Sequence, residues 1–428
     1  MNVCRSFLKY LVYSVVGLVL CCSGCGHRKV EVVPVRNVSH PEGKKKKILV
    51  FSSKGGGGHA SVCRTLDAYL GSEYEIKVIN LFEDVLSSLD PVSMFTFGKA
   101  NGEDLYNLLL HKNSTTFASF LGRTYGPRRM ASCHRSIVRL VTKYVKEEAP
   151  DMLLSVIPLV NKSLLEVAKN LSLPFVLLTN DLDARYYFDG LGKQSYDKCI
   201  CTIAYDDPKV WEFVKSAHFE DGQVRVVGFP VREQFTHTQD IEAIQKEFSL
   251  PADKPTVMVL MGAVGSNGLL LFAKRFARIK KPVHVIFCVG RNEQMPKKLA
   301  KIKFPEHVTI TVVGFTQKVA ELMAASDLLL TKTGANSFNE GIAMSVPMLL
   351  DRTKKVMQWE RYNIEVLKKY NFGGVISHFY ELEHLLDTYL FDRNKNNEIR
   401  KNMQAFYKPN FKEEINKLLV ESFGKAQR

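Results

Sequence analysis

Short apolar runs alternate with longer stretches of helical spacing from residue 48 onward, and the alternation occurs twice along the chain. Apolar runs bounded by polar turns are typical of parallel strands buried on both faces. The first set is Ile48–Ser52, Ile76–Leu81, Met152–Val156, Phe175–Thr179, Ile200–Ala204 and Arg225–Val227. The second is Val257–Met261, Val283–Val289, Val308–Val313, Leu328–Leu330 and Met348–Leu350. With helices such as Ala60–Leu70 and Ser337–Met344 between them, the pattern predicts two doubly wound α/β domains.

The chain of 428 residues is too long for one ordinary core, which agrees with two domains. A polar, proline-punctuated stretch, "PVREQFTHTQDIEAIQKEFSLPADKP", separates the two sets of strands. We predict a first domain over 47–235, a second over 236–405, and a C-terminal helix over 406–428 whose return to the first domain is one possible course. Ligands of such sheets bind beyond the carboxyl ends of the strands, so both domains should present loops to one cleft.

The N-terminus is apolar. Tyr10 to Gly26 contains no charged residue and is preceded by Arg5 and Lys9. We interpret 1–26 as a membrane anchor or signal segment and 27–46 as a basic tether. The basic excess follows the apolar segment, which favours an uncleaved anchor with the body on the cytoplasmic face of a membrane. "CSGC" also resembles a lipobox that would lipidate Cys25, so export as a lipoprotein stays open as the alternative.

The net charge of +15 is compatible with nucleic acid, an anionic membrane or an acidic ligand. Residues 105–146 contain no Asp or Glu but eight Lys and Arg, among them Arg123, Arg128 and Arg129. Aromatic and aliphatic residues are interleaved with these cations. One interpretation is a surface that meets anionic membrane lipids, and the other is a solvated helix face over an ordinary core. No recognised nucleic-acid motif accompanies the charges, so we expect no nucleic-acid partner.

A glycine turn, Gly55 to Gly58, follows the first predicted strand and ends in His59. It fits a dinucleotide fingerprint only loosely, which leaves a dehydrogenase as a remote alternative, and it fails the P-loop pattern because Lys54 precedes the glycines. It could also be a simple strand–helix turn. A histidine at the mouth of the cleft can act as a general base near pH 7. We therefore expect Gly56, Gly57 and Gly58 to face an acceptor or a phosphate, with His59 as a catalytic residue.

The second predicted domain carries a more specific pattern. "CVGRNEQ" places Arg291 and Asn292 just after a strand, where a cation and an amide can meet a phosphate or a base. Gly334 opens a turn after a later strand, and Ser337 is expected to cap the next helix, whose free N–H groups then suit a diphosphate. Glu340, one turn into that helix, can accept hydrogen bonds from a vicinal diol such as ribose.

These residues resemble a family. The run 334–340, "GANSFNE", with "GFT" at 314–316 and "QWERYN" at 358–363, looks like nucleotide-sugar glycosyltransferases of the GT-B fold. "GGGGHAS", "LLTNDLDA" and "VVGFPVREQF" are similar, in order and spacing, to monogalactosyldiacylglycerol synthases and processive diacylglycerol glucosyltransferases. The peptidoglycan-precursor N-acetylglucosaminyltransferase is a relative. The resemblance covers roughly residues 47–405 and implies two Rossmann-like domains that face a cleft.

The resemblance also implies roles for individual residues. Those that would bind the UDP-sugar donor are Gly262, Gly265, Gly334, Ala335 and Ser337 at the diphosphate, Phe315 and Thr316 at the uracil, Glu340 at the ribose, Arg291 and Asn292 along the pocket, and Glu360 and Asn363 at the sugar hydroxyls. His59 would face the acceptor hydroxyl, with Asp181 nearby. The implied reaction transfers a hexose from UDP-glucose or UDP-galactose to diacylglycerol with inversion, and needs neither a metal nor a permanently bound cofactor.

Two departures from the family pattern bear on these roles. Trp359 stands where relatives carry Gln, which leaves the donor sugar open between glucose and galactose. The loop Thr179-Asn180-Asp181 has an extra residue where relatives read Thr-Asp. Two other functions also fit: transfer to another lipid-linked acceptor of the undecaprenyl type, and a sugar-nucleotide-binding protein without turnover.

Overall fold

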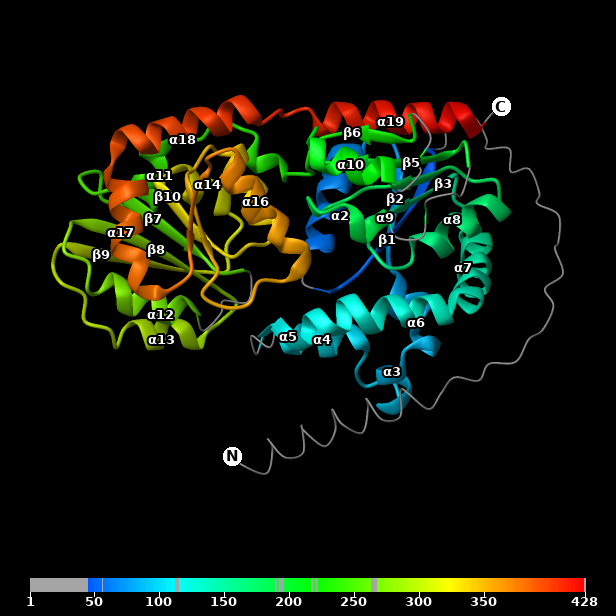
Figure 1. The fold of residues 1–428 in the computed structure, drawn as a ribbon, viewed down its shortest axis with the longest axis horizontal. Coiled ribbons are helices and arrows are strands. Elements are labelled where there is room, and N and C mark those ends of the chain that lie inside the picture. Colours follow the sequence, from blue (N-terminus) through cyan, green and yellow to red (C-terminus); the bar gives the residue numbers. More distant parts are fainter. Residues whose placement is uncertain are drawn as a thin grey trace.

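The structure is a computed structural model that describes residues 45–55, 57–111, 115–188, 191, 196–216, 219, 222–262 and 268–426. The predicted anchor over 1–26, nearly all of the tether, Cys25, Gly56 and Gly265 lie outside these residues. The described chain forms two α/β domains side by side (Figure 1).

The first domain is built on a parallel six-stranded sheet in the order β2-β1-β3-β4-β5-β6. Its strands are β1 (Lys47–Ser52), β2 (Glu75–Asn80), β3 (Met152–Ser155), β4 (Phe175–Leu177), β5 (Cys199–Ile203) and β6 (Val224–Val226). Its helices are α2 (Gly58–Leu70), α3 (Pro91–Phe95), α4 (Gly102–His111), α5 (Thr115–Phe120), α6 (Gly126–Ser132), α7 (His134–Glu148), α8 (Asn161–Asn170), α9 (Arg185–Phe188) and α10 (Pro208–Ser216). All six predicted strands are therefore present.

The second domain repeats this plan in the order β12-β11-β10-β7-β8-β9. Its strands are β7 (Thr256–Leu260), β8 (Val283–Gly290), β9 (Val308–Gly314), β10 (Leu328–Thr331), β11 (Met348–Asp351) and β12 (Gly373–Ile376). Its helices are α11 (Ile241–Phe248), α12 (Gly268–Phe276), α13 (Gln294–Leu299), α14 (Val319–Ala324), α15 (Ala335–Ala343), α16 (Arg361–Lys369), α17 (Leu382–Leu386) and α18 (Arg393–Phe406).

Strand β12 is absent from the sequence prediction because it begins with two glycines, which dilute its apolar pattern. Gly373 has φ 146° and pairs with Met348 in the register of β11 and β12. A Cβ at Gly373 would lie 1.9 Å from the carbonyl oxygen of Met348. Only glycine permits this approach, so the residue that weakens the strand signal is the one that the pairing requires.

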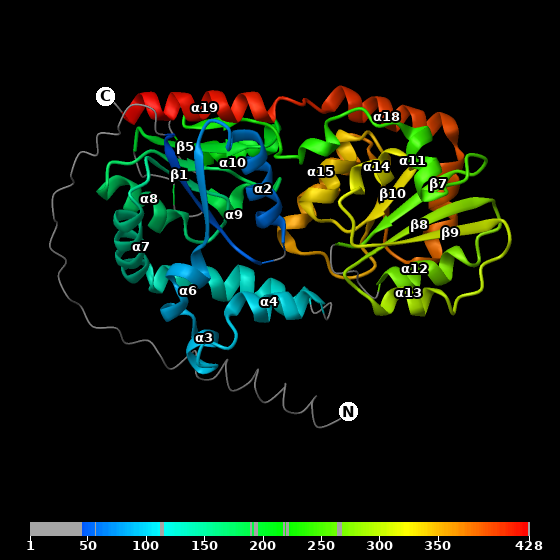
Figure 2. The same ribbon diagram turned by 180° about the vertical axis from the view of Figure 1, so that it is seen from behind.

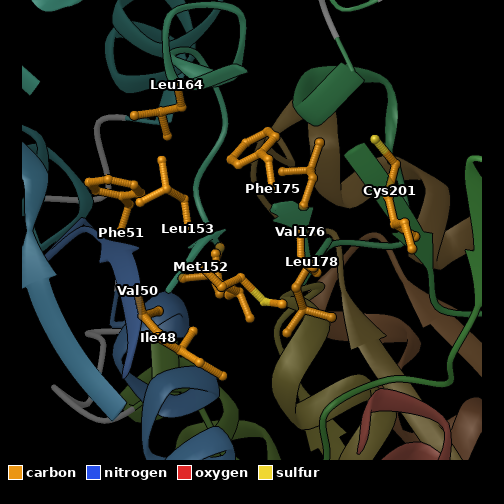
Figure 3. Packing of buried hydrophobic residues seen from close by; sticks show 14 of the residues in the cluster. Ile48, Val50, Phe51, Met152, Leu153, Leu164, Phe175, Val176, Leu178 and Cys201 are labelled. Carbon is orange, nitrogen blue, oxygen red and sulfur yellow. The ribbon is translucent and has the colours of Figure 1, made fainter. Parts of the chain in front are cut away.

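The four inner strands of the first domain, β1, β3, β4 and β5, are buried on both faces, which explains their mostly apolar sequence. Figure 3 shows Ile48, Val50 and Phe51 of β1 next to Met152 and Leu153 of β3 and Phe175 and Val176 of β4. Parallel strands need helices on both sides of the sheet, and the helices between the strands supply this cover. The core thus fixes the strand ends, from which the loops of the cleft extend.

Helix α19 (Phe411–Ala426) follows α18 and runs along the first domain, as the views from both sides show (Figures 1 and 2). Its buried side chains, among them Ile415 and Leu419, belong to the core of the first domain, and the ring of Phe423 stacks on Tyr74 at 5.7 Å between centroids. The chain therefore passes between the domains twice, once before α11 and once after α18.

Candidate active site in the interdomain cleft

A cavity of about 2760 Å³ lies between the domains and is lined by both. The first domain contributes the turn between β1 and α2, the loop after β4, and the segment from α4 to α6. The second contributes the loops after β7, β8 and β9, the turn between β10 and α15, and the 3₁₀ turn Gln358–Glu360. Most of the predicted site residues that the structure describes, among them His59, Asp181 and Glu340, therefore line one space.

The glycine turn carries His59 into this cavity. Gly57 adopts φ 78°, a left-handed conformation that suits glycine, and α2 begins at Gly58. Nothing lies within 4 Å of a Cβ built at Gly57 or Gly58, so the backbone is open to a ligand. His59 Nδ1 lies 2.8 Å from the carbonyl oxygen of Val156. Because a carbonyl only accepts, Nδ1 carries the proton and Nε2 keeps its lone pair.

Burial lowers the pKa of His59 to about 4, although the bond to Val156 opposes the shift. The sequence suggests a base that titrates near pH 7, and the structure instead gives an imidazole that is neutral throughout that range. Asn180 Nδ2 also lies 2.9 Å from His59 Nδ1, but both atoms carry protons in this tautomer, so the amide of the extra loop residue contacts the histidine without donating to it.

Asp181 is the group whose pKa lies near neutrality. Burial first, and the negative charge of Glu360 second, raise its pKa to about 7, against a hydrogen bond from Tyr187 that lowers it. The Tyr187 hydroxyl lies 3.2 Å from Asp181 Oδ2 and also contacts Asn180 Oδ1. The Tyr187 hydroxyl thus bridges Asp181 and Asn180, and the amide of Asn180 in turn contacts the His59 ring.

Helix α15 begins at Ala335 with Gly334 in the capping position, and no side chain caps it. The prediction that Ser337 caps this helix is therefore wrong, because the helix begins two residues earlier. The Ser337 hydroxyl instead accepts a hydrogen bond of 3.1 Å from Thr331. The first backbone N–H groups of α15 stay available to an anion at the cavity wall. Asn336 Nδ2 reaches across to 3.5 Å from the carbonyl oxygen of Gly58, so the two glycine turns face each other.

Glu340 is buried and paired with Arg232, which comes from the segment that follows β6. Arg232 Nε and Nη2 both lie 2.8 Å from Glu340 Oε1. Burial raises the pKa of Glu340, and the Arg232 charge opposes this rise. Since both contacts use Oε1, Oε2 can still accept from a diol. Sequence reasoning missed Arg232, although it is the Arg of the "VVGFPVREQF" motif.

Glu360 and Asn363 differ in what they do. Thr333 donates a hydrogen bond of 2.6 Å to Glu360 Oε2, and burial raises the pKa of this carboxyl. Asn363 was expected to meet sugar hydroxyls, but it is 1% exposed and is not among the residues that line the cavity. Its amide donates to the carbonyl oxygen of Thr333 at 2.7 Å, so it supports the turn before α15.

Lys332, which the sequence reasoning also missed, lines the cavity next to this turn, and burial lowers its pKa.

The loops after β8 and β9 form the far end of the donor side. The Arg291 guanidinium lies 4.4 Å from the centre of the exposed Phe315 ring. Asn292 was expected along the pocket, but its Oδ1 accepts from the Gln294 N–H at 3.2 Å and so supports the start of α13. Thr316 lies in the cavity wall beside Phe315, and its hydroxyl accepts from the Lys318 N–H at 3.0 Å. Gly262 is exposed, with φ 82° and nothing within 4 Å of a Cβ.

Comparison with known proteins fits this geometry. Residues 256–419 match the glycosyltransferase family 28 C-terminal domain. The second domain is therefore similar to the C-terminal domain of family 28, and it is called the family 28 domain below for this likeness. Across 385 residues the chain is 22% identical to the processive diacylglycerol beta-glucosyltransferase of Bacillus licheniformis, which covers 88% of this chain and 95% of that protein. It is 25% identical to a probable chloroplastic monogalactosyldiacylglycerol synthase of Glycine max over 72% of this chain and 59% of that protein.

Solved structures show the same fold. MurG of Acinetobacter baumannii superposes with a TM-score of 0.60 at 13% identity, over 88% of this chain and all of that one. Anabaena HepE in complex with UDP-glucose gives a TM-score of 0.50 at 16% identity, over 89% of this chain and 99% of that one. The predicted GT-B fold and the resemblance to the diacylglycerol glycosyltransferases are confirmed.

Helices α3 to α6 project beneath the first domain, with α4 and α5 pointing towards the second domain and α3 furthest from the body (Figures 1 and 2). Arg128 is exposed, whereas Arg129 is half-buried and donates to the carbonyl oxygen of Leu89 at 3.3 Å. The side chain of Arg123 lies outside what the structure describes. Apolar side chains that the sequence reasoning did not single out are exposed in and just after α3. They are Met94 at 63%, Phe95 at 50% and Phe97 at 92% exposure.

Two further observations concern the chain as far as it is described. None of the helices placed by the structure has the length and apolar character needed to cross a membrane. Within the same residues, no three His, Cys, Asp or Glu side chains are grouped as a metal site would require.

Proposed function

We propose that the protein transfers a hexose from a UDP-sugar to diacylglycerol with inversion at the anomeric carbon, and so makes a glycolipid. The observation that carries the proposal is the single cavity in which the helix N-terminus and Glu340 of the family 28 domain face His59 and Asp181 of the first domain. The printed names of the relatives, diacylglycerol glucosyltransferase and monogalactosyldiacylglycerol synthase, support the acceptor class.

On the donor side, the diphosphate would lie at the N-terminus of α15, where backbone N–H groups point outward and Lys332 adds positive charge. Glu340 would accept hydrogen bonds from the ribose hydroxyls through Oε2. The uracil would meet the loop Phe315–Thr316, and Glu360 would meet a hydroxyl of the hexose. Helix dipole and cations together would stabilise the UDP leaving group, so we expect the reaction to need no divalent metal. Activity that survives EDTA would support this, and activity restored only by Mg²⁺ or Mn²⁺ would contradict it.

On the acceptor side, the hydroxyl oxygen would attack C1 of the hexose as the bond from C1 to the UDP oxygen breaks. The acceptor proton has two candidate destinations, His59 Nε2 and the Asp181 carboxylate. Asp181 is the better match for proton transfer near pH 7, because its pKa of about 7 lies close to the working pH. His59, with a pKa of about 4, would be a weak base that is always available.

A diacylglycerol acceptor lies in a lipid bilayer, so the cleft must meet a membrane surface. The exposed side chains of Met94, Phe95 and Phe97, beside the basic segment 105–146, suit such a surface, since apolar groups can enter the interface while cations meet lipid phosphate. We therefore propose that this projection faces the cytoplasmic side of a membrane and contacts anionic lipids, with the N-terminal segment as an additional anchor.

The test is an assay of UDP release and glycolipid formation with UDP-glucose and with UDP-galactose. The acceptors are vesicles with diacylglycerol, vesicles without it, and vesicles with an undecaprenyl-linked sugar. Glycolipid with diacylglycerol supports the proposal and identifies the hexose. Product only on the undecaprenyl acceptor would replace diacylglycerol with that class. UDP binding without product on any acceptor would mean a sugar-nucleotide-binding protein.

A further inference from the structure

The side chain of Trp359 contacts both sides of the cleft, and the proposed reaction gives this contact no role. It belongs to the turn Gln358–Glu360 of the family 28 domain, yet it packs on the first domain. Its ring edge lies so close to Gly122 that a Cβ added there would be 3.0 Å from Cη2 of the indole. The ring also meets Tyr186 of α9 edge-on, with 6.0 Å between centroids. One residue upstream of this turn, Met357 Sδ accepts from the Ser119 hydroxyl of α5 at 3.1 Å.

The docked turn also carries Glu360. The negative charge of this carboxyl, which belongs to the side of the cavity proposed for the sugar nucleotide, raises the pKa of Asp181. It also raises the pKa of Tyr106 of α4. Trp359, Gly122, Tyr186 and Glu360 all line the cavity. The contact therefore forms part of the cavity wall between the donor turn and the segment from α4 to α6.

We propose that Trp359 is a positioning residue: by docking on Gly122 and Tyr186 it holds Glu360 opposite Asp181 and closes this side of the cavity to water. The proposal rests on the proposed transferase function. Gly122 provides the seat, because a Cβ there would already lie 3.0 Å from the indole and a side chain as large as Leu would have to displace the ring. A smaller, flexible side chain at position 359, such as the Gln of the family pattern, could not fill this seat as the large, rigid indole does.

The chemical consequence concerns the competition between two acceptors. In transfer, the lipid hydroxyl oxygen bonds to C1 of the hexose as UDP leaves. In hydrolysis, a water oxygen does so, and the products are free hexose, UDP and a proton. Opening the wall admits water next to C1 and loosens Glu360 at the same time. Hydrolysis should therefore rise relative to transfer, and the KM for the donor should rise as well.

The first measurement is the ratio of free hexose to glycolipid. A variant that only folds less well loses both products in the same proportion, so the ratio reports on the site. We expect Trp359→Ala to raise the ratio at least fivefold, Gly122→Leu to raise it similarly, and the double variant to do no more than either single change. Trp359→Phe should recover part of the loss. Gly424→Leu, a helical glycine of α19 with nothing within 4 Å, is the matched control.

The second measurement uses fluorescence and does not depend on turnover. The chain has two tryptophans, and Trp211 lies on α10, bonded to Asp206 at 2.6 Å. Trp211→Phe thus leaves Trp359 as the only indole. We expect acrylamide to quench the Trp359 fluorescence at least twice as strongly after Gly122→Leu is added. Adding Gly424→Leu instead should leave the quenching unchanged. An unchanged ratio in Trp359→Ala, or quenching that does not respond to Gly122→Leu, would overturn the proposal. If the wild type forms neither product, the transferase function fails, and the quenching still decides whether the indole is docked.

Discussion

The two candidate bases make different predictions for the pH dependence of the reaction. If Asp181 takes the acceptor proton, its carboxyl must be ionised, and a pKa of about 7 gives roughly nine-tenths ionisation at pH 8 and one-tenth at pH 6. The kcat/KM should then fall about tenfold between these values. If His59 alone takes the proton, a pKa of about 4 leaves the ring about 99% neutral at pH 6, and kcat/KM stays flat.

We expect the fall centred near pH 7, with Asp181 as the base. The assay measures initial rates of UDP release into diacylglycerol vesicles from pH 5 to 9 at constant ionic strength. In His59→Ala the fall should stay near pH 7, although the rate drops because Asn180, which contacts the His59 ring and the Tyr187 hydroxyl beside Asp181, loses its neighbour. In Asp181→Asn the fall should disappear together with most of the activity. A wild-type profile that is flat from pH 5.5 to 8 would refute the reasoning.

Three more predictions follow from the charges of the cleft. Folding raises the pKa of Asp181 from 3.8 to about 7, so the folded protein loses stability as pH rises through this range, by at most about 4 kcal/mol. Asp181→Asn should therefore raise Tm at pH 8 and leave it nearly unchanged at pH 4. An equal rise of Tm at both pH values would contradict this. Glu340→Gln should weaken UDP binding, measured by calorimetry, by about 10- to 100-fold, because bonds to a charged acceptor are worth about 1.5–3 kcal/mol; unchanged affinity would remove Glu340 from the site. Arg232→Met should cost about 3 kcal/mol of unfolding free energy in urea by stranding the Glu340 carboxylate, and adding Glu340→Gln should recover most of it; additive losses would argue against the pair.

The sequence predicts most of the fold because the signal is strong where strands are buried on both faces. Eleven of the twelve strands that the structure describes coincide with a predicted apolar run. The exception, β12, starts with Gly373 for a packing reason that only the neighbouring Met348 reveals. Helix starts are harder to predict: α15 takes Gly334 as its cap, so our predicted cap, Ser337, lies three residues too late.

The candidate site also contains residues that the sequence predicts and residues that it does not. His59, Asp181 and Glu340 lie in the loops that follow strands or in the first turns of the helices after them, and the sequence places them at the cleft because the carboxyl edge of a parallel sheet gathers these segments. Arg232 and Trp359 could not be placed, because each acts on the opposite domain and its partner is far away in sequence. Amides were also misassigned: Asn292 and Asn363 support backbone turns instead of lining the cavity, and which group an amide contacts depends on the local chain path.

The charges of the cleft explain why a sugar nucleotide suits it better than a simple anion. Asp181, Glu340 and Glu360 are all carboxyls whose pKa is raised by burial, and Lys332 is a cation whose pKa is lowered by burial. An inorganic phosphate would compensate Lys332 and the N–H groups of α15, but it would add a negative charge beside the carboxyls. A nucleotide sugar brings its negative charge to the cation and the helix terminus and its hydroxyls to the carboxyls. The arrangement of charge therefore supports the proposed donor, in which an anion stands between two groups that carry hydroxyls.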